Sequence, residues 1–90
     1  MHYVYILRST INGKLYKGST SNLRRRLSMH NSGNVKSTAP YGPWELLYYE
    51  AFINKTDALR EEKFLKTGMG RQRIIYLLQE TIKNLPGGVA

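Results

Sequence analysis

The chain has 90 residues, enough for one domain with a single modest hydrophobic core. It carries 14 Lys and Arg against 6 Asp and Glu, a formal net charge of +8 at pH 7, so polyanions are the expected partners and nucleic acid comes first. It has no cysteine, which excludes disulfides, thiolate catalysis and sulfur-ligated zinc. The sequence shows neither an apolar run near the roughly 20 residues of a membrane span nor a signal peptide, so a cytoplasmic protein without a membrane partner is predicted.

The first two predicted elements are the strands of a hairpin. β-Branched and aromatic residues fill 2–9, and after an Asn-Gly turn signal the chain returns over 14–19. If this turn has two residues, Ser9 pairs with Tyr16, and Tyr5 lies on the same face as Tyr16. A change of one residue in the loop would place the two phenols on opposite faces.

The first predicted helix follows four candidate N-cap residues at 19–22 and has leucines at helical spacing. Arg26 and His30 are four positions apart, so they share one face of this helix. Arg24 and Arg25 point around its sides. Two interpretations remain open here, a solvated amphipathic helix or an anion site built from guanidinium groups, helix amides and hydroxyls.

The middle of the chain is predicted to form a loop, a strand and a second helix. The loop covers 31–43, is rich in Gly, Pro, Ser and Asn, and carries the exposed Lys36. The aromatic-rich segment 44–52 has the length of a third strand. The second helix starts from a cap at Asn54 or Thr56.

The second helix is predicted to have one inward-facing acidic side chain. Ala58, Leu59 and Leu65 define its apolar stripe, and Glu62 falls on or beside that stripe. One interpretation is an i, i+4 ion pair with Lys66 near the end of the helix, worth roughly 0.2–0.5 kcal/mol. The other is a ligand for a hard metal ion.

The last segment is predicted to contain a turn and a third helix. Gly68 to Arg73 (GMGRQR) is a glycine-broken basic turn, and apolar spacing from Ile74 predicts a helix that ends near Asn84. The chain is therefore expected to be one domain over 1–84 with a flexible tail over 85–90.

Together these features resemble the GIY-YIG nuclease domain, specifically its small stand-alone bacterial branch, which is similar to the nuclease module of the enzyme that makes the incisions in excision repair. That family has two tyrosine-bearing strand motifs, then an Arg and a His on the first helix and a Glu on a later helix. Here the motifs are Tyr3-Val4-Tyr5 and Tyr16-Lys17-Gly18, and the resemblance covers nearly the whole chain. It implies an α+β fold with a small three-stranded antiparallel sheet flanked by helices, in the order β-β-α-β-α-α.

The resemblance also implies a metal-dependent endonuclease that hydrolyses DNA phosphodiester bonds, as in DNA repair. Its catalytic positions fall on Tyr5, Tyr16, Arg26, His30 and Glu62. Arg26 is expected to clamp the phosphate, a tyrosine (Tyr5 by preference) to activate the water, and Glu62 to hold one Mg²⁺ or Mn²⁺ ion. Contacts to the nucleic acid outside this site are predicted for Lys17, Arg24, Arg25, Lys36, Arg71 and Arg73.

Two positions depart from the family pattern. Tyr3 stands where the first motif has glycine, and Lys17 stands where the second has an apolar residue. Lys17 is expected to point away from the Tyr16 face, so it alters packing more than chemistry. The asparagine that many members carry after the glutamate helix has no assigned counterpart here.

Two other classes of function remain open. A non-catalytic nucleic-acid-binding module would explain the charge, although it has no use for an inward carboxylate beside a tyrosine pair. A protein-interaction module that uses segment 44–52 has no specific support. The expected partner is DNA, with RNA left open and a protein partner as a source of specificity, and the sequence does not give the oligomeric state.

Overall fold

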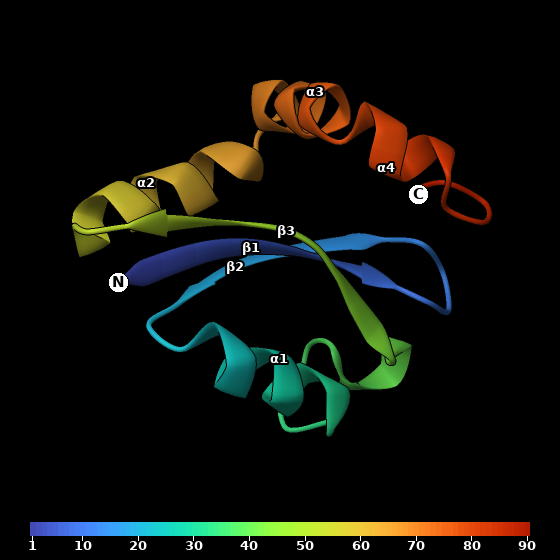
Figure 1. Cartoon of the computed structure of the whole chain (residues 1–90). Coiled ribbons are helices and arrows are strands. Elements are labelled where there is room, and N and C mark those ends of the chain that lie inside the picture. Colours follow the sequence, from blue (N-terminus) through green and yellow to red (C-terminus); the bar gives the residue numbers. More distant parts are fainter.

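The structure is a computed structural model that describes all 90 residues. Its elements are β1 His2–Ser9, β2 Leu15–Thr20, α1 Leu23–Asn31, the 3₁₀ turn η1 Ala39–Tyr41, β3 Trp44–Phe52, α2 Lys55–Leu65, α3 Gly68–Leu77 and α4 Gln79–Lys83. A three-stranded antiparallel sheet in the order β2-β1-β3 lies between two helical layers (Figure 1). The predicted α+β fold is therefore confirmed. None of the helices is long and apolar enough to cross a bilayer.

The central strand β1 is buried on both faces, so alternate side chains build two separate cores. Val4 and Ile6 point toward α2 and α3, where they pack with Ala58, Leu65, Ile74 and Leu78. Tyr5 and Leu7 point the other way and pack with Trp44, Leu23 and Leu27 beneath α1. Leu59 was predicted to join the first core but is 47% exposed, so the apolar stripe of α2 is narrower than predicted.

The hairpin between β1 and β2 differs from the prediction in register but not in facing. The residue opposite Tyr16 is Leu7, not Ser9. Five residues, 10–14, connect the two strands, and the Ser9 side-chain oxygen accepts hydrogen bonds from the Ile11 and Asn12 amides at 3.1 and 3.2 Å. The register therefore shifts by two residues, which preserves side-chain alternation, and Tyr5 and Tyr16 share one face as predicted.

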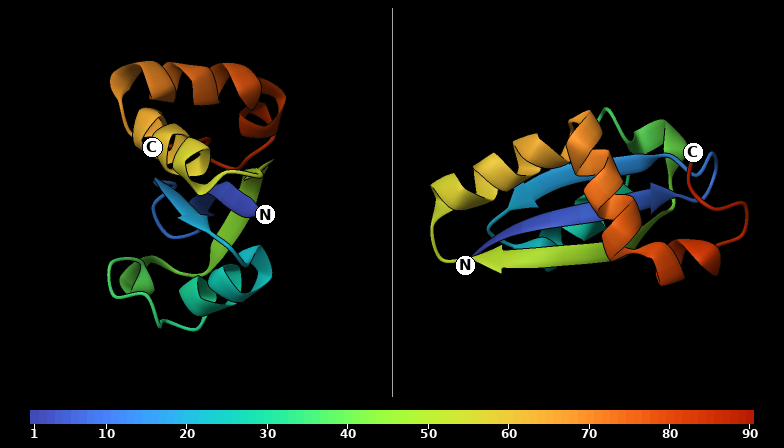
Figure 2. Two further views of the ribbon diagram at one scale, coloured as in Figure 1. Left: turned by 90° about the vertical axis from the view of Figure 1, so that its left-hand side faces the viewer. Right: turned by 90° about the horizontal axis from the view of Figure 1, so that it is seen from above.

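The predicted turn over 68–73 is wrong, because α3 begins at Gly68. The Thr67 side chain caps this helix by accepting a hydrogen bond from the Gly70 amide at 3.1 Å. A Cβ on Gly70 would lie 2.6 Å from the Leu65 Cα, so this glycine serves the close approach of two helices and not a break in the chain. Figure 2 shows α3 crossing above the strands.

The C-terminal segment also differs from the prediction. The single third helix is two helices, α3 and α4, with a break between them. Residues 85–90, predicted to be a flexible tail, fold back beside the hairpin end of the sheet (Figure 2). The buried Arg8 donates hydrogen bonds to the carbonyls of Pro86 and Gly88 at 2.6 and 2.7 Å and pairs with Glu45 at 2.8 Å. These contacts join the segment to β1 and β3, and the flexibility of 85–90 stays a prediction.

Candidate active site

Four of the five predicted catalytic side chains meet between the sheet and α1, and we call them the α1 cluster: Tyr5, Tyr16, Arg26 and His30. The Tyr5 Oη lies 2.9 Å from His30 Nε2 and accepts a hydrogen bond from Arg26 Nε at 3.4 Å. The Tyr16 ring centroid is 4.9 Å from that of His30 and 6.3 Å from that of Tyr5. The helical spacing of Arg26 and His30 therefore brings both to one phenol.

Gly18 makes room for the Tyr5 hydroxyl. It is paired with Tyr5 across β1 and β2, and a Cβ on Gly18 would lie 2.5 Å from Tyr5 Oη and 3.1 Å from the Tyr16 ring. Any larger residue would push against the two phenols, so the motif glycine is required by packing at the site. Of the four candidate caps, Asn22 caps α1, accepting a hydrogen bond from the Arg25 amide at 3.0 Å.

A threonine that the sequence did not single out holds the far side of the imidazole. His30 is 1% exposed, and its Nδ1 lies 2.8 Å from the Oγ1 of the equally buried Thr38. The Thr38 carbonyl accepts a hydrogen bond from the Trp44 indole at 2.9 Å, and its hydroxyl reaches the Val35 carbonyl at 3.3 Å. Thr38 lies in the Gly- and Pro-rich loop, where nothing in the local pattern marks it as buried.

These contacts assign the proton positions in the buried series of hydrogen bonds from Tyr5 through His30 to Thr38. If Thr38 donates to Val35, its oxygen accepts the Nδ1–H of His30, and Nε2 is then the acceptor for the Tyr5 hydroxyl. The opposite tautomer would leave the buried Tyr5 hydrogen without an acceptor, which is costly. Burial, followed by the charge of Arg26, lowers the pKa of His30, so the ring is neutral at pH 7.

The Tyr5 phenol is also neutral at this pH. Burial raises its pKa, although the hydrogen bond from Arg26 acts in the opposite direction. Tyr5 therefore holds its proton between its own oxygen and His30 Nε2, with Arg26 on the other side of the same oxygen.

The fifth residue, Glu62, approaches from the other helical layer. Its carboxylate accepts hydrogen bonds from Ser19 Oγ at 2.5 Å and Lys66 Nζ at 2.7 Å, and its side chain is 20% exposed. Its inward position and its pair with Lys66 both agree with the sequence prediction, whereas the sequence indicates Ser19 only as a candidate helix cap.

Glu62 is ionised at neutral pH. Burial would raise its pKa, but the hydrogen bonds from Lys66 and Ser19, with a further contribution from the charge of Arg26, bring the pKa below its usual value. Because the charge of Arg26 contributes to the lowered pKa of Glu62, the carboxylate lies within electrostatic range of the α1 cluster. The two sites lie on opposite faces of the sheet, and the edge strand β2, which carries Ser19, lies between them. No three or more His, Asp or Glu side chains gather anywhere in the chain.

A hollow with a volume of about 270 Å³ opens beside Arg26, and we call it the Arg26 hollow. It is lined by Thr20, Ser21, Asn22, Arg25, Arg26 and Met29. Two guanidinium groups, two hydroxyls and an amide therefore surround a space without an acidic side chain. This donor set suits a phosphate group.

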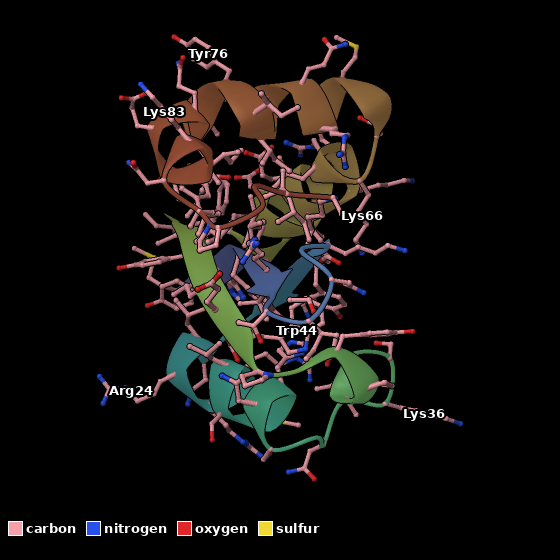
Figure 3. All side chains as sticks on the ribbon, turned by 90° about the vertical axis from the view of Figure 1, so that its right-hand side faces the viewer. Arg24, Lys36, Trp44, Lys66, Tyr76 and Lys83 are labelled. Atoms are coloured by element: carbon pink, nitrogen blue, oxygen red, sulfur yellow. The ribbon has the colours of Figure 1, made fainter.

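The six other predicted nucleic-acid contacts do not form one surface. Lys17 lies on the α2 and α3 side of the sheet as expected, and burial, then the charges of Arg71 and Lys66, lower its pKa. Lys36 and Lys66 project on one flank and Arg24 on the opposite flank (Figure 3).

Two more of the six predicted contacts, Arg25 and Arg73, lie apart from each other. Arg25 lines the Arg26 hollow. Arg73 is close enough to Glu50 and Tyr48 to lower the pKa of each, against the larger effect of burial, which raises both. It therefore lies away from the α1 cluster, over β3.

Comparisons with known proteins show the family of the chain. Residues 1–74 match the GIY-YIG catalytic domain. The chain is 50% identical over 66 residues to a UPF0213 protein of Oceanobacillus iheyensis, which covers 72% of this chain and 76% of that protein. It is 38% identical over 84 residues to a UPF0213 protein of Clostridium perfringens, covering 92% and 89% of the two chains.

A solved structure supports the same relationship. The solution NMR structure of a UPF0213 protein from Bacillus halodurans is 35% identical and superposes with a TM-score of 0.54, covering 84% of this chain and 83% of the other. GIY-YIG domains are generally endonucleases. The chain belongs to the GIY-YIG family and is similar to the small stand-alone bacterial UPF0213 proteins.

Proposed function

We propose that the chain is an endonuclease that hydrolyses DNA phosphodiester bonds at the α1 cluster. Phosphodiester hydrolysis requires an activated water, neutralisation of the charge that develops at phosphorus and stabilisation of the leaving oxygen. The observation that carries the proposal is the Tyr5 hydroxyl, held between the neutral His30 Nε2 and the Arg26 guanidinium. A binding surface alone has no need of this buried acid-base pair.

In this proposal the scissile phosphate binds in the Arg26 hollow. Arg26 turns from Tyr5 toward the phosphate oxygens, an exchange favoured because its 3.4 Å hydrogen bond to the phenol is long. Arg25 and the Thr20 and Ser21 hydroxyls line the same hollow and supply further donors. The move also frees a lone pair on the Tyr5 oxygen for the water.

The water then loses its proton along a short relay. Its proton passes to the Tyr5 oxygen while the Tyr5 proton passes to His30 Nε2, and the resulting hydroxide attacks phosphorus. The bond from phosphorus to the leaving oxygen breaks in the same displacement, and the leaving alkoxide takes a proton from solvent. A concerted transfer avoids a free phenolate, which the raised pKa of Tyr5 disfavours. Thr38 keeps Nδ1 protonated, so Nε2 is the nitrogen that accepts. Tyr16, packed on His30, positions the water and the ring.

One divalent ion, Mg²⁺ or Mn²⁺, is the cofactor of this proposal, and the donor set at Glu62 fits it. The carboxylate is ionised and partly exposed, and Mg²⁺ commonly binds one or two protein carboxylates and retains several waters. When bound, the ion supplies positive charge for the leaving oxygen. Ser19 orients the Glu62 carboxylate, while Lys66 must release it.

The cations outside the site serve the DNA backbone in this proposal. We assign this role to Lys17, Arg24, Arg25, Lys36, Arg71 and Arg73, as the sequence predicted. Such contacts give affinity that depends on salt and little on sequence.

The test is cleavage of single-stranded, duplex, flap and four-way-junction DNA in Mg²⁺ or Mn²⁺. Wild-type protein is expected to cut at least one substrate, and EDTA is expected to abolish cutting. Glu62→Gln removes the charge at the same volume, and Tyr5→Phe removes only the hydroxyl of the relay. Each is expected to reduce the rate by about 100-fold to 10,000-fold.

Glu80→Gln is the matched control, because Glu80 is an exposed carboxylate on α4. It should cut at the wild-type rate. Salt-sensitive binding to DNA without cleavage of any substrate would refute the proposal and favour the non-catalytic binding module.

A further inference from the structure

An apolar groove lies on the sheet face that carries Tyr5, on the β3 side of α1. It has a volume of about 470 Å³ and is lined mainly by Tyr3, Leu23, Leu27, Leu46 and Tyr49, with Arg24 on its wall. We call it the aromatic groove. Tyr49 is 53% exposed, and its ring meets that of Tyr3 edge to face at 6.1 Å between centroids.

The groove adjoins the proposed phosphate site. Ser21 and Asn22, at the start of α1, line both the aromatic groove and the Arg26 hollow. Across the sheet, Tyr49 is paired directly with Tyr5, the proposed acid-base residue. A strand with a phosphate in the Arg26 hollow therefore has the aromatic groove within the reach of one of its nucleotides, across the first turn of α1.

The charge of the groove favours the same occupant. No acidic side chain lines it, and Arg24 projects from α1 on this flank (Figure 3). An exposed tyrosine ring beside a guanidinium group is the combination that stacks nucleobases while it attracts their backbone. A stacked base needs an exposed ring face, and a base within a duplex has none to offer.

We propose that the aromatic groove binds an unpaired nucleobase of the DNA strand whose phosphate occupies the Arg26 hollow, with Tyr49 as the stacking residue. The inference rests on the proposed nuclease function and adds to it a substrate class: DNA with an unpaired base next to the scissile phosphate, as in single strands, flaps and junctions.

The test measures binding in EDTA, where no cleavage occurs, using fluorescence anisotropy with a single-stranded oligonucleotide and its fully paired duplex. Tyr49→Ala is expected to weaken single-strand binding by about fivefold to 150-fold and to change duplex binding little. Tyr49→Phe retains the ring and should bind like wild type. An oligonucleotide with 2-aminopurine should lose fluorescence on binding wild-type protein and not on binding Tyr49→Ala.

Tyr76→Ala is the matched control, because Tyr76 is 70% exposed on the outer face of α3, in the opposite helical layer (Figure 3). It should leave both affinities unchanged. Equal losses on single strand and duplex, or no loss for Tyr49→Ala, would refute the groove. So would a wild-type dimer in sedimentation that Tyr49→Ala converts to monomer, because the groove would then bind a second copy of the chain.

Cleavage in Mg²⁺ is measured separately with the same variants, so the two proposals fail in different ways. Base stacking without any cleavage supports the groove and refutes the nuclease. Cleavage by wild type together with unchanged single-strand binding by Tyr49→Ala supports the nuclease and refutes the groove.

Discussion

Replacing Gly18 with alanine is expected to separate the Tyr5 hydroxyl from His30. The new Cβ would lie 2.5 Å from Tyr5 Oη and 2.6 Å from Cζ, whereas ordinary contacts begin at 3.4 Å, so the gap must widen by about 0.9 Å. The Tyr5 hydrogen bond to His30 is 2.9 Å long, and a displacement of that size is enough to break it. Tyr5 is 1% exposed, so its ring has little free space into which to move.

Two magnitudes follow from this displacement. Overpacking of a buried site typically costs about 1–3 kcal/mol of unfolding free energy. A shift near 1 Å in a catalytic group commonly costs about 100-fold in rate. Gly18→Ala should therefore unfold at lower urea concentration than wild type and should cut DNA about 100-fold more slowly.

Urea unfolding followed by the fluorescence of Trp44, the only tryptophan, gives the first value without any assumption about activity. Gly68→Ala is the control, because a Cβ there meets nothing within 4 Å in the first turn of α3. It should be as stable as wild type or slightly more so. If Gly18→Ala and Gly68→Ala unfold at the same urea concentration, the argument from close contact at Gly18 is wrong.

Three further predictions concern the buried polar groups. In urea unfolding, Arg8→Ala should lower the unfolding free energy by about 2–3 kcal/mol, because it leaves the Pro86 and Gly88 carbonyls and the Glu45 carboxylate without their donor. Arg60→Ala removes an exposed ion pair and should lower the unfolding free energy by less than about 0.5 kcal/mol in the same experiment. Burial, followed by the neighbouring carboxylate of Glu61 on α2, raises the pKa of Glu50 to about 7. The folded state therefore binds a proton at Glu50 more tightly than the unfolded state does. The stability that this group contributes is therefore full below about pH 4.5 and is lost as the pH rises through about 7. Glu50→Gln should then gain about 1–2 kcal/mol over wild type near pH 8, after allowance for solvent screening, and nothing near pH 4; an equal change at both pH values would contradict this reasoning. Thr38→Val removes the acceptor of the His30 Nδ1–H, so nitrogen NMR should show a mixture of His30 tautomers in the variant and one tautomer in wild type; one tautomer in both would rule out the assigned role.

Periodicity in the sequence was sufficient for much of the candidate site. Alternation in a strand placed Tyr5 and Tyr16 on one face even though the turn was mispredicted, because a slip of two residues leaves the facing unchanged. Helical spacing brought Arg26 and His30 together and turned Glu62 inward. These inferences succeeded because each concerns neighbours within one strand pair or one helix.

Local patterns failed where a distant segment decides the outcome. Glycine spacing after α2 suggested a turn, but Gly70 is needed for the contact between α2 and α3, and the helix continues through it. The Gly- and Pro-rich ending predicts a flexible tail, a prediction that stays untested, and no pattern there indicates that a buried arginine of β1, Arg8, donates hydrogen bonds to its carbonyls. The residues next to Gly70 and next to the C-terminal carbonyls in the sequence do not predict either contact.

The sequence by itself determined the fold class, the family and the chemical groups of the candidate site, because those depend on side-chain identity and on periods of 2 and 3.6 residues. Only the tertiary structure decided how the groups act together. It placed Thr38 behind His30 and so selected the nitrogen that faces Tyr5, and it brought Glu62 around β2 from the opposite layer. Hydrogen bonds between segments far apart in the chain depend on how the layers pack, and no local pattern encodes that packing.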